Sequence, residues 1–256
     1  MLRAEKRKAR SGAVAKPAPQ QKSQQRRPPP DAATAALDTS RPRPALQVLP
    51  GAPPTIAYAA DWISEAEEAA IVAAAKRGDD WVTVRGRRLR RLGGPAGEAG
   101  FAPEPLPRWA RDACAAAAAS DPSLSRPVPN HVLVNAYDFS KESYVLPHTD
   151  GPAYDDRTFT LSCGADAVVV FKERLKTSDI GVRAAATRCE VLLRRRSLLA
   201  FSREAYTECT HEIGAAPDTI GLCCVNLDAA DARVGDVVGR AGERVSFTLR
   251  CARGAE

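Results

Sequence analysis

Two of the three histidines and a nearby carboxylate have the spacing of a metal site. His148 and Asp150 are two residues apart, so on a strand both side chains point to one face, and His211 follows 61 residues after Asp150. Two imidazoles and one carboxylate form the facial triad that binds non-haem Fe(II) and leaves coordination positions open for substrate and oxygen. The same residues are also compatible with Zn binding or with ordinary hydrogen bonds in a protein core.

Two strand-like segments nearby carry polar residues at every second position. Asn135 and Tyr137 share one face of the first. In "RVSFTLRC" the residues on one face are Arg244, Ser246, Thr248 and Arg250. Alone, this pattern indicates an amphipathic strand whose arginine face lies in water. Together with the upstream His-x-Asp pair it also fits a dicarboxylate cosubstrate, because a guanidinium binds a carboxylate through two hydrogen bonds.

Two helices are predicted ahead of these segments. The first runs from about residue 64 to 76, where Ser64 and Glu67 have the spacing of a capping box. The second, alanine-rich helix lies within residues 103–123 and ends near Asp121, because Pro122 follows. Between the two helices, the sequence predicts a strand followed by a loop rich in glycine and arginine, "WVTVRGRRLRRLGGPAGEAG".

After residue 129 the sequence changes to short β runs separated by turn signals. Strands of this length and spacing favour a sandwich or barrel, so the fold class is mostly β with N-terminal helices, α+β overall. We therefore expect helices in residues 45–128 and a β core in residues 129–253. Two longer connections, at about 173–188 and 215–241, are expected to be functional or mobile.

The first 44 residues differ in composition from the rest of the chain. They are rich in Pro, Ala, Gln and Arg and lack the apolar surface that folding requires, so we expect them to be disordered. They carry a net charge of +8, which leaves the remaining 212 residues near −2. A basic arm of this kind indicates an anionic partner or a nuclear import signal such as "KRKAR", although a solvated tail explains the charges equally well.

Cysteine usage and hydropathy indicate the compartment. Seven cysteines without C-x-x-C spacing favour a reducing environment with mostly buried thiols. No run approaches 18 apolar residues, so no membrane association is expected. The sequence favours the nucleus or cytoplasm, and an arginine-rich, acid-poor start keeps an organelle transit peptide as an alternative.

Taken together, these motifs resemble the AlkB family of Fe(II)- and 2-oxoglutarate-dependent dioxygenases. The resemblance covers about residues 52–252, with Asn-x-Tyr, His-x-Asp, the distal histidine and Arg-x-Ser-x-Thr-x-Arg in the family's order. Within the family, "LPRW", "NHVLVNAY" and "HTDGPAY" are most similar to the alkB homolog 6 branch. The resemblance implies a double-stranded β-helix, or jelly roll, with N-terminal helices packed on it.

The resemblance also implies a role for each motif. His148, Asp150 and His211 would bind Fe(II), with O₂ as the oxidant. The residues expected to bind 2-oxoglutarate are Asn135, Tyr137, Arg244 and, as the family's second arginine, Arg250. The segment before the core would recognise nucleotides through Trp81, Arg87, Arg88, Arg90 and Arg91, unless these are only a solvated basic strand and loop.

The implied function is oxidative demethylation of alkylated nucleic acid by a monomer, with RNA and DNA both open. A first alternative is a dioxygenase that acts on protein or on a small molecule, because the same metal site serves unrelated substrates. A second alternative is a non-catalytic nucleic-acid-binding protein whose metal site is vestigial.

Overall fold

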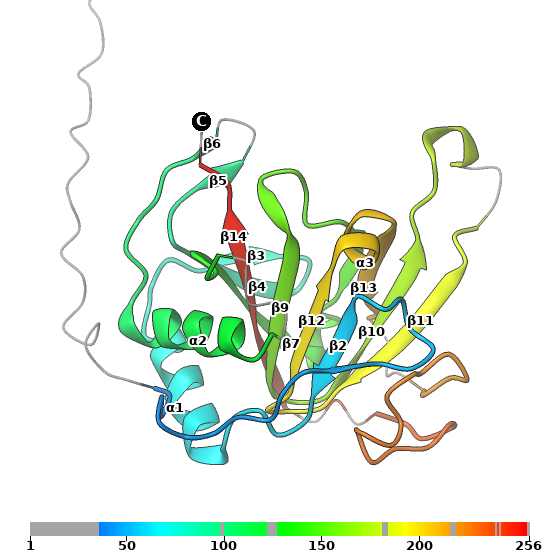
Figure 1. Cartoon of the computed structure of the whole chain (residues 1–256), viewed down its shortest axis with the longest axis horizontal. Coiled ribbons are helices and arrows are strands. Elements are labelled where there is room, and N and C mark those ends of the chain that lie inside the picture. The colour runs from blue at the N-terminus through cyan, green and yellow to red at the C-terminus, as the bar shows by residue number, and fades with distance from the viewer. Residues whose placement is uncertain are drawn as a thin grey trace, which may run out of the picture.

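The computed structural model describes residues 36–97, 100–121, 127–180, 184–215, 219–238, 240 and 242–254. Two antiparallel sheets face each other, and helices cover the outer side of the larger sheet (Figure 1). This arrangement is the jelly roll that the family resemblance predicts. Among the described residues, no helix has the length and hydrophobicity that a membrane span requires.

The larger sheet has eight strands in the order β1-β2-β12-β9-β14-β7-β4-β3. Its strands are β1 (Gln47–Val48), β2 (Ile56–Ala59), β3 (Val82–Val84), β4 (Arg87–Leu92), β7 (His131–Asp138), β9 (Tyr154–Gly164), β12 (Leu198–Ser202) and β14 (Glu243–Ala252). β14 pairs with β7 on one side and with β9 on the other. These three long central strands give the sheet a broad inner face on which side chains stand in rows.

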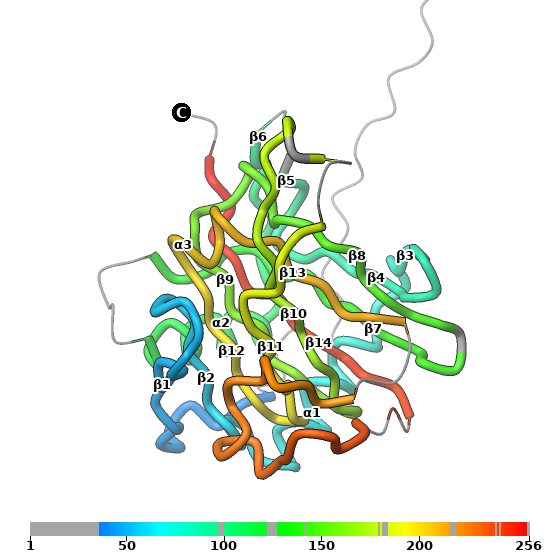
Figure 2. The backbone as a smooth tube through the Cα atoms, turned by 90° about the vertical axis from the view of Figure 1, so that its right-hand side faces the viewer, coloured from blue at the N-terminus to red at the C-terminus, as the bar shows by residue number. Residues whose placement is uncertain are grey.

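The smaller sheet has four strands in the order β11-β10-β13-β8 (Figure 2). They are β8 (Val145–His148), β10 (Ala167–Glu173), β11 (Thr187–Leu193) and β13 (Cys209–Ile213). A separate hairpin joins β5 (Ala96–Gly97) and β6 (Gly100–Phe101). The remaining short elements are the 3₁₀ turns η2 (Phe139–Lys141) and η3 (Thr177–Asp179) and the helix α3 (Arg203–Thr207).

Two longer helices pack on the outer face of the large sheet (Figure 1). Helix α1 (Glu65–Lys76) begins after Ser64, whose side chain and that of Glu67 form the predicted capping box. Helix α2 (Arg108–Ala119) ends just before the predicted stop. Trp109 of α2 meets Phe247 of β14 edge to face, with ring centroids 5.7 Å apart.

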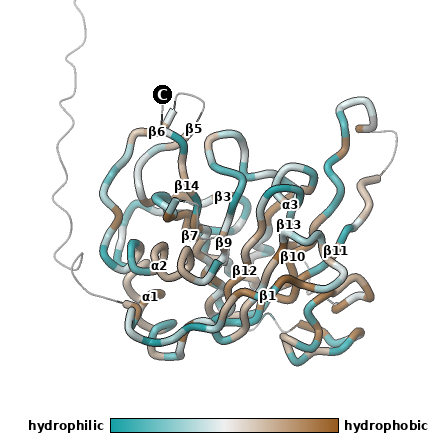
Figure 3. Tube along the Cα trace, in the orientation of Figure 1, coloured by the Kyte–Doolittle hydropathy of each residue, from teal (hydrophilic) through white to brown (hydrophobic). Residues whose placement is uncertain are grey.

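Two further hydrophobic clusters complete the core. Phe171, Phe201 and Leu199 belong to the cluster that packs between the sheets. Ile220 and Val238 belong to another, against the outer side of β10 and β11. Hydrophobic residues accordingly concentrate along the central strands, whereas many of the loops are hydrophilic (Figure 3). The long connection after β13 is therefore a packed cover for the small sheet in the part that the structure describes.

Two expectations from the sequence need correction, and a third concerns residues outside the described ranges. The arginine-rich stretch Arg87–Leu92 is the strand β4 and not a loop, because it pairs along its length with β7. Residues 36–44 belong to the folded part: Ala36 and Leu37 are buried, and Arg43 forms an ion pair with Glu67 at 2.8 Å. Residues 1–35 lie outside the described ranges.

The thiols follow the expected pattern. Six of the seven cysteines are buried, Cys223 is exposed, and none forms a disulfide.

Candidate metal centre and cosubstrate cavity

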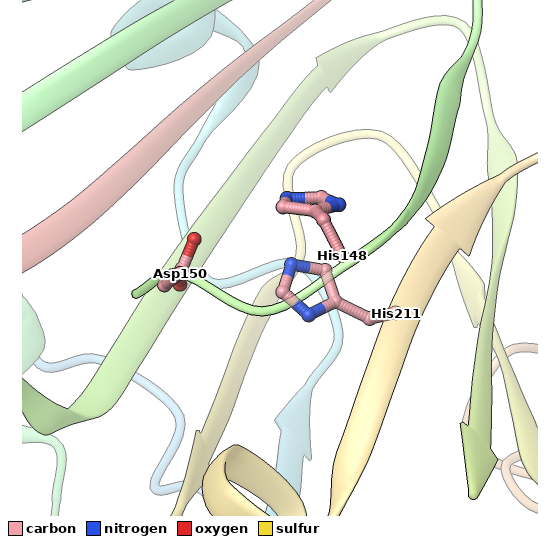
Figure 4. A group of neighbouring side chains, drawn as sticks. All are labelled: His148, Asp150 and His211. Carbon is pink, nitrogen blue, oxygen red and sulfur yellow. The ribbon is translucent and has the colours of Figure 1, made fainter. Parts of the chain in front are cut away.

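The structure brings together the three residues that the sequence selects as metal ligands. One potential ligand atom from each of His148, Asp150 and His211 lies within 4.8 Å of the other two (Figure 4). Within the described residues, this is the one group of three or more His, Cys, Asp or Glu side chains with such spacing. Two imidazole nitrogens and one carboxylate oxygen fit Fe(II) in a facial arrangement.

Strand pairing places the two histidines. His148 ends β8 and His211 lies on β13, and the two residues are direct cross-strand partners. Their ring centroids are 4.3 Å apart. Phe201 and Phe171 also pack near His211, at 5.1 and 6.1 Å between ring centroids. This packing limits the freedom of the His211 ring.

The ring nitrogens of both histidines are suited to metal binding. His148 Nδ1 lies 2.9 Å from the Leu146 carbonyl oxygen, and a proton donated there leaves Nε2 with a free lone pair. Burial lowers the pKa of His211 to about 4, although the nearby Asp150 carboxylate opposes the shift. His211 is therefore neutral at pH 7, which is the form that binds a metal.

Asp150 is held at both of its oxygens. Oδ1 accepts a hydrogen bond from Arg250 Nη1 at 2.9 Å, and Oδ2 accepts one from Thr158 Oγ1 at 2.7 Å. Burial alone would raise the pKa of Asp150, yet Arg250, His211 and Thr158 lower it below its ordinary value. The carboxylate is therefore ionised and fixed in one orientation.

A cavity of about 70 Å³ adjoins these three residues, and both sheets line it. Polar lining residues of the large sheet are Arg87, Asn135, Tyr137, Thr160, Arg244, Ser246 and Thr248. Apolar lining residues include Val169, Leu193, Leu199 and Phe201. The cavity therefore combines polar groups on the inner face of one sheet with an apolar wall.

Arg244 is the fully buried cation of this cavity. Its side chain is inaccessible to solvent, its Nε donates to Ser162 Oγ at 3.1 Å, and its guanidinium lies 5.0 Å from the centroid of the Tyr137 ring. Nη1 and Nη2 have no hydrogen-bond partner among the described residues. Burial lowers the pKa of Arg244. A buried guanidinium with two unpaired nitrogens is costly, and a carboxylate would satisfy both.

The expected cosubstrate residues separate into two groups. Asn135, Tyr137 and Arg244 all line the cavity, and Asn135 is 5% exposed. Arg250 does not line it: its guanidinium pairs with Asp150 and lies 3.8 Å from the centroid of the Tyr154 ring. Arg250 thus supports a candidate metal ligand, which differs from the cosubstrate contact that the resemblance implies.

The expected nucleotide-recognition residues also separate, because side chains alternate along β4. Arg87 and Arg91 are paired with Tyr137 and Leu133, whose side chains line the cavity. Arg88, Arg90 and Trp81 lie toward the helices instead.

Arg88, Arg90 and Trp81 make their contacts on the side of the sheet that the helices cover. The Arg88 guanidinium lies over the Trp81 ring at 5.1 Å and forms an ion pair with Glu243. Arg90 bonds Asp80 and the Ala75 carbonyl. The structure therefore does not bring Trp81, Arg88 and Arg90 to the cavity.

His131, the third histidine, is fully buried behind the site. Its two ring nitrogens have no partner among the described residues, and its ring lies 5.2 Å from that of Tyr154. Burial, assisted by the charges of Arg250 and Arg91, lowers the pKa of His131 to about 4. It is therefore a neutral core residue.

Sequence reasoning missed the polar residues of β9. Thr158 bonds Asp150, Ser162 bonds Arg244, and Thr160 lies between them in the cavity wall. The signal was present in "TFTLS", where polar side chains occupy every second position of a strand with a buried apolar face. Their register opposite Arg250, Thr248 and Ser246 places them in the site.

Comparison with known proteins supports the family resemblance by an extended sequence match. No protein-family model matches the chain. A Danio rerio protein named "Probable RNA/DNA demethylase ALKBH6" is 31% identical over 205 residues, which cover 78% of this chain and 86% of that protein.

Solved structures that are similar at lower identity include the following two. OsALKBH1 is 19% identical with a TM-score of 0.48 and covers 80% of this chain and 99% of its own. A 2OG-Fe(II) oxygenase family oxidoreductase from Burkholderia pseudomallei is 17% identical with a TM-score of 0.44, over 78% and 86% of the two chains.

Proposed function

Because this chain belongs to the AlkB family of Fe(II)- and 2-oxoglutarate-dependent dioxygenases, we propose that it oxidatively demethylates alkylated RNA or DNA. The name of the Danio rerio relative supports the choice of nucleic acid. Arg91, which lies on the same face of β4 as the cavity-lining Arg87, supplies positive charge beside the cavity.

The proposal assigns a task to each part of the site. His148, Asp150 and His211 bind Fe(II), and Arg250 and Thr158 hold the Asp150 carboxylate in place. Together with O₂, the bound iron and 2-oxoglutarate supply oxidation of a substrate C–H bond, with succinate and CO₂ as coproducts. An N-methyl group oxidised in this way leaves as formaldehyde.

In this proposal, the residues of the chain bind and orient 2-oxoglutarate and exclude water from the cavity. Arg244 binds the distal carboxylate of 2-oxoglutarate, and Asn135 and Tyr137 line the space next to it. The apolar wall formed by Leu199 and Phe201 keeps water from the cavity.

One observation supports this proposal most strongly. The His-Asp-His group and Arg244, a buried cation with two unpaired nitrogens, line the same cavity. A carboxylate at Arg244 would satisfy two guanidinium nitrogens that the protein itself leaves unpaired, and a metal would bind the two imidazoles and the carboxylate of the triad. A dicarboxylate with a metal-binding end fulfils both requirements.

The first experiment tests the metal and cosubstrate together. Fe(II) and 2-oxoglutarate, added without oxygen, should give the visible charge-transfer band of a chelated complex. Asp150→Ala should abolish the band, whereas Asp155→Ala, a change at a partly exposed aspartate that pairs with Arg253, should leave it unchanged. A wild-type protein without the band would refute the assignment.

The second experiment identifies the substrate class. Methylated RNA, methylated DNA, methylated peptides and small molecules are each incubated with the protein, and succinate release is measured together with loss of one methyl mass. Turnover of RNA or DNA alone supports the proposal. Turnover of peptides alone would refute it.

A dioxygenase that acts on protein or a small molecule remains the second candidate. It is favoured by the orientation of Trp81, which packs toward the helices and so offers no stacking surface at the cavity. The near-neutral charge of residues 45–256 favours it too. The substrate panel distinguishes the two candidates.

A further inference from the structure

Arg87 occupies a position on the inner face of the large sheet that the nucleotide-recognition role does not explain. It lies opposite Tyr137 of β7, and Tyr137 lies opposite Arg244 of β14. Cross-strand partners in an antiparallel sheet point to the same face, so these three side chains form one row. All three line the cavity.

This row lies further along β14 than the residues that hold Asp150. Asp150 is held by Arg250 and Thr158, which are partners across β14 and β9. Arg250 follows Arg244 by six residues on the same strand, so the two arginines enter the site from different positions along β14. Arg87 is therefore level with the end of the cavity where the distal carboxylate of 2-oxoglutarate would bind.

The charges at this end of the cavity are unbalanced. Arg87 Nε is inaccessible to solvent and has no hydrogen-bond partner among the described residues, as is also the case for Nη1 and Nη2 of Arg244. Asp150 is the one carboxylate among the lining residues, and it already pairs with Arg250. Two guanidiniums thus offer unpaired nitrogens to one space without a protein anion between them.

A single carboxylate could satisfy both guanidiniums. Its two oxygens accept about four hydrogen bonds, which is more than the two that Arg244 alone can donate through Nη1 and Nη2. Hydrogen bonds between charged groups are also the strongest available to the protein.

We propose that Arg87 binds the distal carboxylate of 2-oxoglutarate together with Arg244, so that the cosubstrate site contains two guanidiniums. Arg87 is then a cosubstrate residue and does not contact nucleic acid, and Arg91, on the same face of β4, is the arginine that remains for the substrate. The inference rests on the proposed use of 2-oxoglutarate.

The test measures cosubstrate binding and needs no turnover. Calorimetry follows the titration of 2-oxoglutarate into protein loaded with Mn(II), which replaces Fe(II) and avoids oxidation. Arg87→Gln should raise the Kd for 2-oxoglutarate about ten-fold or more. Arg88→Gln is the matched control, because Arg88 is the next residue on β4, points to the opposite face and is 50% exposed. Its Kd should equal that of the wild type.

A second ligand separates a carboxylate contact from a general disturbance. 2-Oxopentanoate has the metal-binding end of 2-oxoglutarate and lacks the distal carboxylate, so its Kd should be the same for the wild type and Arg87→Gln. If Arg87→Gln does not fold, as judged by circular dichroism, Arg87→Lys replaces it. Lysine keeps the charge without the guanidinium fork, and a several-fold rise in Kd is expected.

The outcomes distinguish this inference from the function on which it rests. If the wild type binds 2-oxoglutarate and Arg87→Gln binds it equally well, the inference is overturned and the proposed function stands. Weaker RNA or DNA binding by Arg87→Gln, with unchanged 2-oxoglutarate affinity, would return Arg87 to substrate recognition. If the wild type does not bind 2-oxoglutarate, both proposals fail.

Discussion

Replacing Thr158 by valine should weaken metal binding, although Thr158 is not itself a ligand. The substitution keeps the shape of the side chain and removes the hydroxyl that donates to Asp150 Oδ2 at 2.7 Å. Thr158 is completely buried and the Asp150 side chain is 5% exposed, so water cannot readily replace the lost donor.

The expected magnitude follows from that hydrogen bond. A hydrogen bond to a charged group contributes roughly 1.5–3 kcal/mol, and each 1.4 kcal/mol changes a Kd about ten-fold. Arg250 still holds Oδ1, so the carboxylate keeps one of its two contacts. We therefore expect a ten- to hundred-fold rise in the Kd for Mn(II) or Fe(II), the range seen when residues that orient metal ligands are replaced.

The assay is calorimetric titration of Mn(II) into the wild type, Thr158→Val and Thr158→Ser. Serine retains the hydroxyl, so Thr158→Ser should bind Mn(II) within a few-fold of the wild type. Unchanged or tighter binding by Thr158→Val would refute the reasoning, because the hydroxyl would then lower the basicity of Asp150 more than it orients the carboxylate.

Two further predictions concern stability and the arginines of β4. Burial alone would raise the pKa of Glu67, but hydrogen bonds from Arg43 and from the backbone N–H groups of Ser64 and Asp38 lower it from 4.5 to about 2. Because the folded-state pKa is depressed, Glu67 stabilises the fold above pH 4.5 by roughly 2–3 kcal/mol, and this stabilisation is lost as the pH falls toward 2. Urea unfolding should show Glu67→Gln to be less stable than the wild type at pH 7, with a smaller difference at pH 3; an equal difference at both values would contradict the pKa assignment. Arg90→Gln should lower the free energy of unfolding by about 1 kcal/mol, because it breaks the contacts with Asp80 and Ala75, and should leave nucleic-acid affinity unchanged. Arg91→Gln should leave the stability unchanged, but it should weaken RNA or DNA binding and reduce the salt dependence of that binding. Equal nucleic-acid binding by Arg90→Gln and Arg91→Gln in filter-binding assays would argue against a nucleic-acid contact on the cavity face.

Several features of this protein could be read from the sequence because they depend on residues close together in the chain. A capping box needs only Ser64 and Glu67 at the right spacing, and the structure has the helix there. The alternation of polar and apolar residues in β7 and β14 likewise needs only the two-residue period of a strand. The ligand types and their order along the chain, together with the family's motifs, predicted the jelly roll and the candidate metal site.

The tertiary structure alone decided which residues are partners. Sequence spacing cannot show that His211 pairs with His148, or that Arg250 bonds Asp150, because these contacts depend on the register of strands that are far apart in the chain. The arginines of β4 also show that strand pairing decides which residues are neighbours. The family resemblance implied one nucleotide-recognition role for all of them, but pairing with β7 places Arg87 and Arg91 on the cavity face of the sheet and Arg88 and Arg90 on the helix face. Each strand has two faces, and only its neighbouring strands and the residues that pack on it determine which face meets the cavity and which face meets the helices.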